Sequence, residues 1–591
     1  MCRKCDEGIP QTHSSSRRDF LKATAATGAA AAAARADLFA PRPAAARDGD
    51  SPQDTGRRGR RYIIRGGAVM TMDPSMPNKG EFAHADVFVE GTKIVAVGPN
   101  LRAGGVAEID ARGRIVMPGF IDTHHHQFET ALRSFLADGV LILDGDTAPE
   151  GAFAYYQSIL LGFAPVYRPQ DVYISELFGG LSQLDDGVTT VHDVSQIHHT
   201  PQHSDAAVQA LFDTGRRAAF GYFEGAGEGV VVVTPGYNYP NLVEATRIKN
   251  KWFSSSDQLV HMIMGGEVYL GDASTVASWN IGRQLGLQIA AHILSPFGIA
   301  PIFDRLAKPP AGDVFNTIQK APGSNIPIGP DNLFIHMTGM SDNGWAAVKN
   351  TGAQVSLAVP IEMNMRHGMP PILRLQKLGI EPSLSVDVEV TLTADFFTQM
   401  RSMMNQQRML VNQITLDGGA GSVNGLPNPL DWGINTSPPA NPWPGYPNGA
   451  IPAPLTARDV LRYATINGAK GLGLDGKVGT LTPGKEADII ILDASRINVA
   501  PLNHVPGAVV SLMDRTNVET VIVAGKIRKW KGVLLDNSSG APMDLTRLQA
   551  QLEASRDYLF KQYINNPFVG NPVTGNPPIT HGIPKDLFRS N

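Results

Sequence analysis

Short apolar runs bounded by glycine or polar residues fill both ends of this chain and predict β-strands. The first set lies at residues 62–64, 68–70, 86–89 and 93–97, with turns expected at Gly66-Gly67 and Gly91-Thr92. A matching set lies at residues 488–492, 518–523 and 525–526. Strands from the two ends can pair with each other, so the pattern predicts one small β-domain built from both ends of the chain.

The middle of the chain alternates strand-like apolar runs with amphipathic stretches. The run at 188–191 precedes an amphipathic stretch at 206–214, and the stretch at 273–287 precedes the run at 288–291. Such alternation is typical of a (β/α)8 TIM barrel. The predicted fold class is therefore α/β: a TIM barrel with a small discontinuous β-sandwich domain formed by the N- and C-terminal segments.

Paired arginines and an alanine-rich run give the N-terminus the character of an export signal. Arg17-Arg18 precede the run at 23–34, and small residues recur at 44–46. The arrangement resembles a twin-arginine signal, which predicts the twin-arginine translocase as a partner and a periplasmic or secreted location. Both cysteines lie within this signal, so we expect no disulfide in the mature chain.

These patterns divide the chain into six segments. They are the twin-arginine signal peptide at 1–46, a linker at 47–60, the first part of the β-domain at 61–117, the barrel at 118–472, the second part of the β-domain at 473–535, and a C-terminal helix and tail at 536–591. Within the last segment, residues 543–563 form the helix-like stretch.

Composition narrows the classes of function. The 591 residues are 42% hydrophobic and 18% charged, which suits a large core, and the net charge of −4 gives no basic excess for nucleic acid. No interior run offers the roughly 20 apolar residues of a transmembrane helix, so we expect no stable membrane insertion. A small-molecule substrate is the expected partner, and a homo-oligomer is compatible with the sequence.

The strongest chemical signal is a histidine pair at the end of an apolar strand, in residues 117–126. Strand alternation sends His124 and His126 to the same side and His125 to the other. Active sites of TIM barrels lie at the carboxyl ends of the strands. Two imidazoles held in this way can share a divalent metal ion.

This segment resembles the first metal motif of the amidohydrolase superfamily, in the branch similar to cytosine deaminases and chlorohydrolases. The flanking segments 109–116, 464–469 and 479–488 match that family too, and the resemblance covers nearly the whole mature chain. It implies a third histidine ligand at His292, a substrate-polarising histidine at His336 and a carboxylate ligand at Asp387. Each of the three closes an apolar run.

The resemblance implies one divalent metal ion per chain, held by His124, His126, His292 and Asp387. Zinc and ferrous iron both suit this ligand set. The run at 259–264 offers no lysine for the bridging carbamate of two-metal relatives, which favours a single ion. Asp387 and His336 are the expected catalytic residues, with Asp387 passing a proton from water to the leaving group and His336 stabilising charge on the substrate.

One position departs from the family pattern, because Ser295 stands where the deaminases usually carry a proton-shuttling glutamate. Serine cannot serve as an acid near neutral pH. Four residues are candidates for contacting the substrate or replacing that glutamate, with solvated-loop or strand-capping roles as the alternative: Gln127, Glu362, His367 and Glu389.

The expected function is hydrolysis of a C–N bond in a small cyclic or heteroaromatic compound, either in a cyclic amide or at an amine substituent on a ring. The serine at position 295 favours the cyclic amide. An aminohydrolase or chlorohydrolase acting on a heteroaromatic ring is the alternative. A secreted binding protein that has kept the fold and lost turnover is the competing hypothesis from another class.

Overall fold

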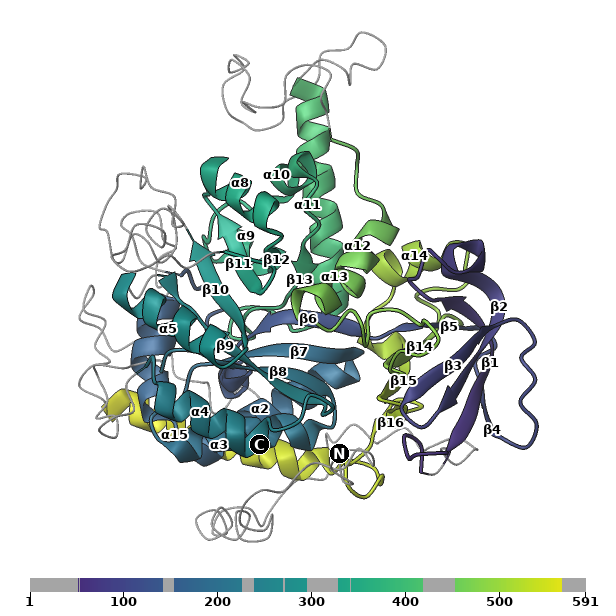
Figure 1. The fold of residues 1–591 in the computed structure, drawn as a ribbon, viewed down its shortest axis with the longest axis horizontal. Coiled ribbons are helices and arrows are strands. Elements are labelled where there is room, and N and C mark those ends of the chain that lie inside the picture. The colour runs from purple at the N-terminus through teal and green to yellow at the C-terminus, as the bar shows by residue number, and fades with distance from the viewer. Residues whose placement is uncertain are drawn as a thin grey trace, which may run out of the picture.

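The computed structural model describes residues 54–141, 154–225, 239–268, 272–294, 328–340, 342–417 and 452–565, together with Pro52. Figure 1 shows a barrel surrounded by helices and, at its side, a smaller β-domain. In that domain, purple strands from the N-terminal segment lie beside yellow-green strands from the C-terminal segment.

Eight parallel strands form the barrel, in an order that follows the chain. They are β6 (Phe120–His125), β7 (Val188–Ser195), β8 (Arg217–Tyr222), β9 (Val260–Gly265), β10 (Gln288–Leu294), β11 (Asn332–Thr338), β12 (Gln354–Leu357) and β13 (Ser383–Leu384). A bridge between His125 and Asp387 links the first strand to the segment after the eighth. The predicted (β/α)8 barrel is confirmed.

Helices cover the outside of the barrel. They are α2 (Pro169–Asp185), α3 (Pro201–Thr214), α4 (Leu242–Trp252), α5 (Asp272–Gln284), α8 (Asp342–Thr351), α9 (Val359–Asn364), α10 (Ile372–Leu378), α11 (Phe396–Asp417), α12 (Ala457–Tyr463) and α13 (Ile466–Gly471). The predicted stretch 206–214 lies within α3, and 273–287 corresponds to α5.

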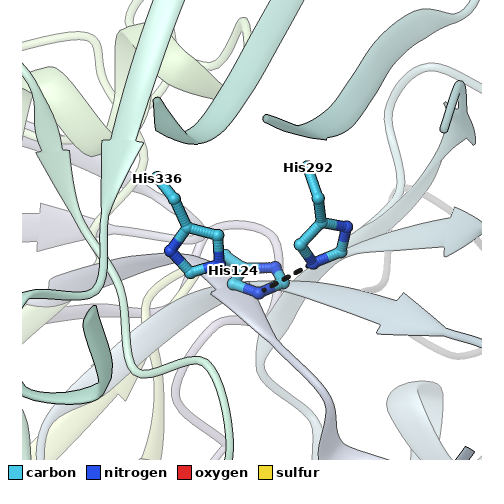
Figure 2. Close-up of side chains that lie close together, drawn as sticks. All are labelled: His124, His292 and His336. Atoms are coloured by element: carbon cyan, nitrogen blue, oxygen red, sulfur yellow. Dashed lines mark hydrogen bonds between the residues drawn. The ribbon is translucent and has the colours of Figure 1, made fainter. Parts of the chain in front are cut away.

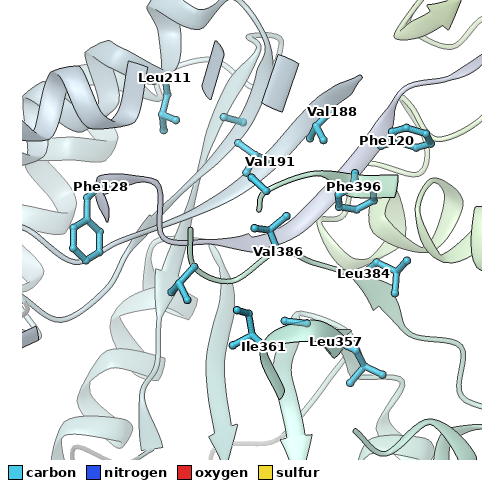
Figure 3. Close-up of a cluster of buried hydrophobic side chains, with 14 of the residues drawn as sticks. Phe120, Phe128, Val188, Val191, Leu211, Leu357, Ile361, Leu384, Val386 and Phe396 are labelled. Carbon is cyan, nitrogen blue, oxygen red and sulfur yellow. The ribbon is translucent and has the colours of Figure 1, made fainter. Parts of the chain in front are cut away.

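An apolar layer between strands and helices holds the barrel together. Figure 3 shows Val188 and Val191 of β7 in the same cluster as Phe120 of β6 and Phe396 of α11. The rings of Phe120 and Phe396 stack with centroids 5.6 Å apart. Because these strands are buried on both faces, they read in the sequence as nearly continuous apolar runs.

The β-domain joins the two ends of the chain in one nine-stranded sheet. Its strands are β1 (Arg61–Met70), β2 (Glu81–Glu90), β3 (Lys93–Gly98), β4 (Ala107–Asp110), β5 (Arg114–Pro118), β14 (Ile489–Asp493), β15 (Val518–Val523), β16 (Lys526–Trp530) and β17 (Val533–Leu534). β14 pairs antiparallel with β5, with Ile490 opposite Met117. The predicted assembly from both ends is confirmed, and its strands share one apolar core.

The turn expected at Gly66-Gly67 is wrong. β1 runs straight through both glycines, with register shifts against β2 around Gly67. Gly66 has φ +71°, and a Cβ on Gly67 would lie 2.7 Å from the side chain of Val116. The two glycines therefore serve an irregularity in the strand and a close approach of β5, which the sequence pattern does not distinguish from a turn.

The C-terminal helix predicted at 543–563 is α15 (Leu545–Asn565), and it packs against α2. Ser555 Oγ donates a hydrogen bond to Asp171 Oδ1 at 2.7 Å, and Tyr563 stacks on Phe163 with centroids 4.1 Å apart. Short helical segments complete the described fold: η1 (Pro77–Gly80), η2 (Gln127–Leu132), η3 (Tyr156–Phe163), η4 (Ala164–Val166), α14 (Val505–Gly507), η6 (Ala508–Leu512) and η7 (Arg515–Asn517).

Three predicted features lie outside the described residues: the signal at 1–46, Ser295, and the tail beyond Asn565. Among the helices that the structure describes, none combines the length and the apolar character needed to cross a bilayer.

A buried ion pair fastens the β-domain to the barrel. Arg217, the first residue of β8, donates through Nε to Asp488 Oδ2 at 3.0 Å, and the two side chains are 4% and 3% exposed. The other oxygen of Asp488 accepts the backbone N–H of Ala524 at 2.8 Å. Removing the arginine would leave the carboxylate buried without its partner charge, which costs more than the intact pair contributes.

We expect Arg217→Met to lower the free energy of unfolding by about 3–5 kcal/mol, measured by urea denaturation. The matched control is Arg458→Met, because Arg458 and Glu81 also link the two parts but are 50% and 39% exposed. That exposed pair should contribute less than about 1 kcal/mol. Equal losses in the two variants would contradict this account of the domain interface.

Candidate metal centre

The two histidines of the first motif meet one carboxylate oxygen at the end of β6. His124 Nε2 lies 3.0 Å and His126 Nε2 lies 3.5 Å from Asp387 Oδ1, and both imidazoles are buried. They share a side of the strand, as alternation requires. His125 faces the other side, toward Asp122 and Glu389, and is buried as well.

His292 comes to the same point from β10. A carboxylate fixes its ring, since Nδ1 lies 2.6 Å from Glu267 Oε1 and the backbone N–H donates to Oε2 at 3.1 Å. Because an ionised carboxylate only accepts, this contact places a proton on Nδ1 and leaves the lone pair on Nε2. That Nε2 lies 3.2 Å from His124 Nε2, as Figure 2 shows.

His336 enters from β11 and is fixed in the same manner. Its Nδ1 lies 3.1 Å from Glu362 Oε1, and this oxygen also accepts the backbone N–H of Ala358 at 2.9 Å. When Glu362 is ionised, this contact places the proton of His336 on Nδ1. The lone pair of Nε2 then faces Asp387 Oδ2, 3.5 Å away.

Asp387 follows β13 in an unusual backbone conformation. His336 and Asp387 have φ values of +68° and +72°, in the left-handed region that costs non-glycine residues about 1–3 kcal/mol. Asp387 is held there because its N–H donates to His124 O, and its own carbonyl accepts the N–H of His126, both at 2.9 Å. These two backbone hydrogen bonds place the carboxylate of Asp387 beside His124 and His126.

Four donor atoms therefore converge in a buried space: Nε2 of His124, His126 and His292, and Oδ1 of Asp387. A single proton on His124 Nε2 could serve either Asp387 or His292, but not both. A divalent cation satisfies all four donors at once, and imidazole nitrogen with carboxylate oxygen is a donor set that zinc and ferrous iron accept. His124, His126 and Asp387 meet the geometric requirement for holding a metal ion, and so do His124, His292 and His336.

The electrostatics of the cluster favour the neutral imidazoles that a metal requires. Burial, followed by the neighbouring imidazoles, holds the pKa of His124 and His126 well below the usual histidine value. Burial also lowers the pKa of His336, to about 4. For His292, burial acts in the same direction, but the charge and hydrogen bond of Glu267 outweigh it and raise the pKa.

Two of the four predicted substrate-contacting residues lie at this centre. His367 is 4% exposed, and its Nδ1 lies 3.9 Å from Asp387 Oδ2. Glu362 contacts His336 through the hydrogen bond described above. Its position is that of a residue that orients the imidazole, and burial raises its pKa well above the usual value.

Gln127 and Glu389 lie elsewhere, which argues against their predicted roles. Gln127 donates to Glu176 at 3.2 Å within a buried network that also contains Arg216. Glu389 accepts from Thr130 at 2.9 Å and pairs with Arg133 at 2.7 Å. The prediction for Glu389 assumed an extended strand after Asp387, but the positive φ at Asp387 turns the chain.

Glu267 is the residue that the sequence reasoning missed. It lies two residues after the end of β9, at the carboxyl ends of the barrel strands. A carboxylate at that place in a TIM barrel is a candidate functional residue. The sequence prediction for the run 259–264 concerns only a bridging lysine and does not extend to residue 267. The neighbouring histidines His198, His199 and His203 are structural, because each donates to or accepts from nearby backbone or hydroxyl groups.

Comparison with known proteins agrees with this fold. Residues 450–528 match the Amidohydrolase family, and residues 14–34 match the twin-arginine translocation pathway signal sequence. The 5'-deoxyadenosine deaminase of Methanosarcina acetivorans is 22% identical over 510 residues, which cover 82% of this chain and 94% of the relative.

Solved structures share the fold. An adenosine deaminase from Xanthomonas campestris with bound zinc superposes with a TM-score of 0.65 at 19% identity, covering 85% of this chain and 98% of the other. Atrazine chlorohydrolase from Arthrobacter aurescens TC1, complexed with zinc, gives a TM-score of 0.63 at 18% identity, covering 84% and 100%.

The structure defines a TIM barrel with a cluster of histidine and carboxylate donors at the carboxyl ends of its strands. The sequence matches support the predicted resemblance to the amidohydrolase superfamily, and residues 14–34 match a twin-arginine export signal.

The contact between Glu267 and His292 leads to a testable prediction. Removing the negative charge in Glu267→Gln should weaken Zn²⁺ binding about 10–100-fold, because such a partner fixes the tautomer and raises the basicity of a ligating imidazole. The measurement is competition with a chromophoric chelator. Glu129→Gln is the control, since Glu129 is equally buried but accepts from Tyr155 instead. An unchanged affinity in Glu267→Gln would contradict the assignment.

Proposed function

We propose that this protein is an exported hydrolase that uses one divalent metal ion to cleave a C–N bond at an sp² carbon of a small nitrogen heterocycle. His124, His126, His292 and Asp387 would hold the ion, which is Zn²⁺ or Fe²⁺. The observation that supports the proposal most directly is the convergence of three imidazole nitrogens and one carboxylate oxygen at the carboxyl end of the barrel. When bound, such an ion acts as a Lewis acid and makes water a nucleophile near neutral pH.

The chain's own residues would manage the protons. Asp387 Oδ2 is buried without a hydrogen-bond partner, so it can accept a proton from the attacking water and return it to the leaving nitrogen. With its proton on Nδ1, His336 presents a lone pair at Nε2. It can therefore accept a hydrogen bond from water or a substrate N–H, and it donates to a developing anion only after taking up a proton.

The two forms of the reaction differ in which C–N bond breaks. The relatives named above include deaminases, which supports removal of an exocyclic amine. The serine at position 295 favours hydrolysis of a cyclic amide, because serine cannot transfer a proton to the ring as the glutamate of the deaminases does. Loss of an exocyclic amine releases ammonia and keeps the ring, whereas amide hydrolysis opens the ring, so the products separate the two.

The export signal supports a site of action beyond the cytoplasmic membrane. The twin-arginine translocase carries folded proteins, so the barrel and its ion would be assembled before export. We propose the periplasm or the extracellular medium as the destination of the mature chain.

The proposal is tested by elemental analysis of the purified protein together with turnover. We expect about one zinc or iron per chain, lost in His124→Ala and kept in the exposed control His84→Ala. Aminopyrimidines, aminotriazines and cyclic amides are screened by released ammonia and by ring opening. Asp387→Ala should lower kcat by at least about 100-fold with an unchanged circular dichroism spectrum.

Absence of metal after growth with added zinc and iron would contradict the proposal and favour a binding protein without turnover. Turnover that survives both His124→Ala and Asp387→Ala would place the chemistry elsewhere in the chain.

A further inference from the structure

A second set of donors lies beside the first, on the far oxygen of the same aspartate. His336 Nε2 is 3.5 Å and His367 Nδ1 is 3.9 Å from Asp387 Oδ2. The three residues are buried and meet the geometric requirement for holding a metal ion. We propose that they form a second, weaker site for a divalent cation, and that an ion bound there inhibits the enzyme. The inference rests on the proposed function, because the two sites share Asp387.

The pairing of His336 with Asp387 is unfavourable without a cation. Glu362 Oε1 accepts the backbone N–H of Ala358 and lies 3.1 Å from His336 Nδ1. In the tautomer with its proton on Nδ1, His336 has no proton at Nε2 to donate. Its lone pair then faces the lone pairs of Asp387 Oδ2, which has no hydrogen-bond partner. Two acceptors held 3.5 Å apart in a buried space repel each other, and a bound cation turns the same arrangement into an attraction.

His367 supplies the third donor. Both of its ring nitrogens are buried without a hydrogen-bond partner, and its ring stands 4.7 Å from that of His336 at 84°. A buried polar group without a partner is destabilising, and a bound cation would provide His367 with one. The backbone at His367 is held in place because Thr338 Oγ1 donates a hydrogen bond to its carbonyl at 2.5 Å.

Asp387 offers one oxygen to each site. Oδ1 faces His124 and His126, and Oδ2 faces His336 and His367, so a single carboxylate can serve two ions. The first set has three imidazoles and a carboxylate, whereas the second has two imidazoles and the remaining oxygen. With fewer ligands, the second site should bind more weakly. Nitrogen donors select Zn²⁺, Co²⁺, Ni²⁺ or Cu²⁺ over Mg²⁺ and Ca²⁺.

Occupancy of the second site has a consequence for the reaction. An ion there would use the lone pair of His336 Nε2 and the free oxygen of Asp387, which are the two groups that the proposed mechanism assigns to proton handling. Excess Zn²⁺ should therefore inhibit an enzyme that needs the first ion for activity.

The test is a titration of the metal-free full-length protein with Zn²⁺ against a chromophoric chelator, repeated with Co²⁺ by visible absorption. The wild type should bind two equivalents, the second at least tenfold more weakly than the first. His367→Ala should keep the first equivalent and lose the second. His84→Ala, which removes an exposed imidazole on β2, is the matched control and should keep both.

The outcomes separate the two proposals. A single equivalent in the wild type would overturn this inference and leave the proposed function intact, whereas no bound metal would overturn both. A second equivalent that persists in His367→Ala would place that ion elsewhere and overturn the inference. If His367→Ala loses its circular dichroism spectrum, His367→Gln serves as the variant, and the Co²⁺ spectrum of the second equivalent must still change.

Discussion

The closure of the barrel between its first strand and the segment after its eighth is the contact on which the centre depends. β13 is only two residues long, and beyond it the chain is held to β6 by bonds around Asp387. Asp122 reinforces this seam, because its Oδ1 accepts the N–H groups of His124 at 3.1 Å and Val386 at 3.2 Å. One buried carboxylate thus holds the backbones of His124 and Val386 together.

That arrangement carries a cost in free energy. Burial raises the pKa of Asp122 to about 7, even though Gln183 and two backbone N–H groups favour its charged form. The left-handed conformations of His336 and Asp387 add backbone strain, and the inward lone pairs of the imidazoles repel one another. Backbone strain of this kind persists where the surrounding structure enforces the conformation. Binding of a cation at the donors would offset its free-energy cost. Glu267 and Glu362 contribute by holding the imidazole rings of His292 and His336 through Nδ1, so that each ring presents Nε2 to the interior.

The sequence predicted the architecture because the relevant signals are local. Apolar runs that alternate with amphipathic helices indicate a parallel barrel, and the spacing of His124 and His126 places both on one side of a strand. The resemblance to the amidohydrolase superfamily then pointed to His292, His336 and Asp387, which the structure brings together with the pair.

The errors arose where backbone conformation decides direction. Strand alternation predicts that Glu389 lies on the same side as Asp387, but the positive φ at Asp387 breaks that alternation. Gly66-Gly67 has the composition of a turn, yet it lies inside a strand. The contacts of Glu267 and His367 depend on how separate loops pack against each other at the carboxyl end of the barrel. The spacing of residues along the sequence does not predict that packing.

The central claim is that His124, His126, His292 and Asp387 hold a metal ion in the native protein. Anomalous X-ray diffraction from crystals of the mature chain, recorded at the zinc and iron absorption edges, tests it most directly. The account predicts that the strongest anomalous peak lies within coordination distance of Nε2 of the three histidines and Oδ1 of Asp387. A crystal grown with both metals present that shows no peak there, or its strongest peak at other residues, would contradict it.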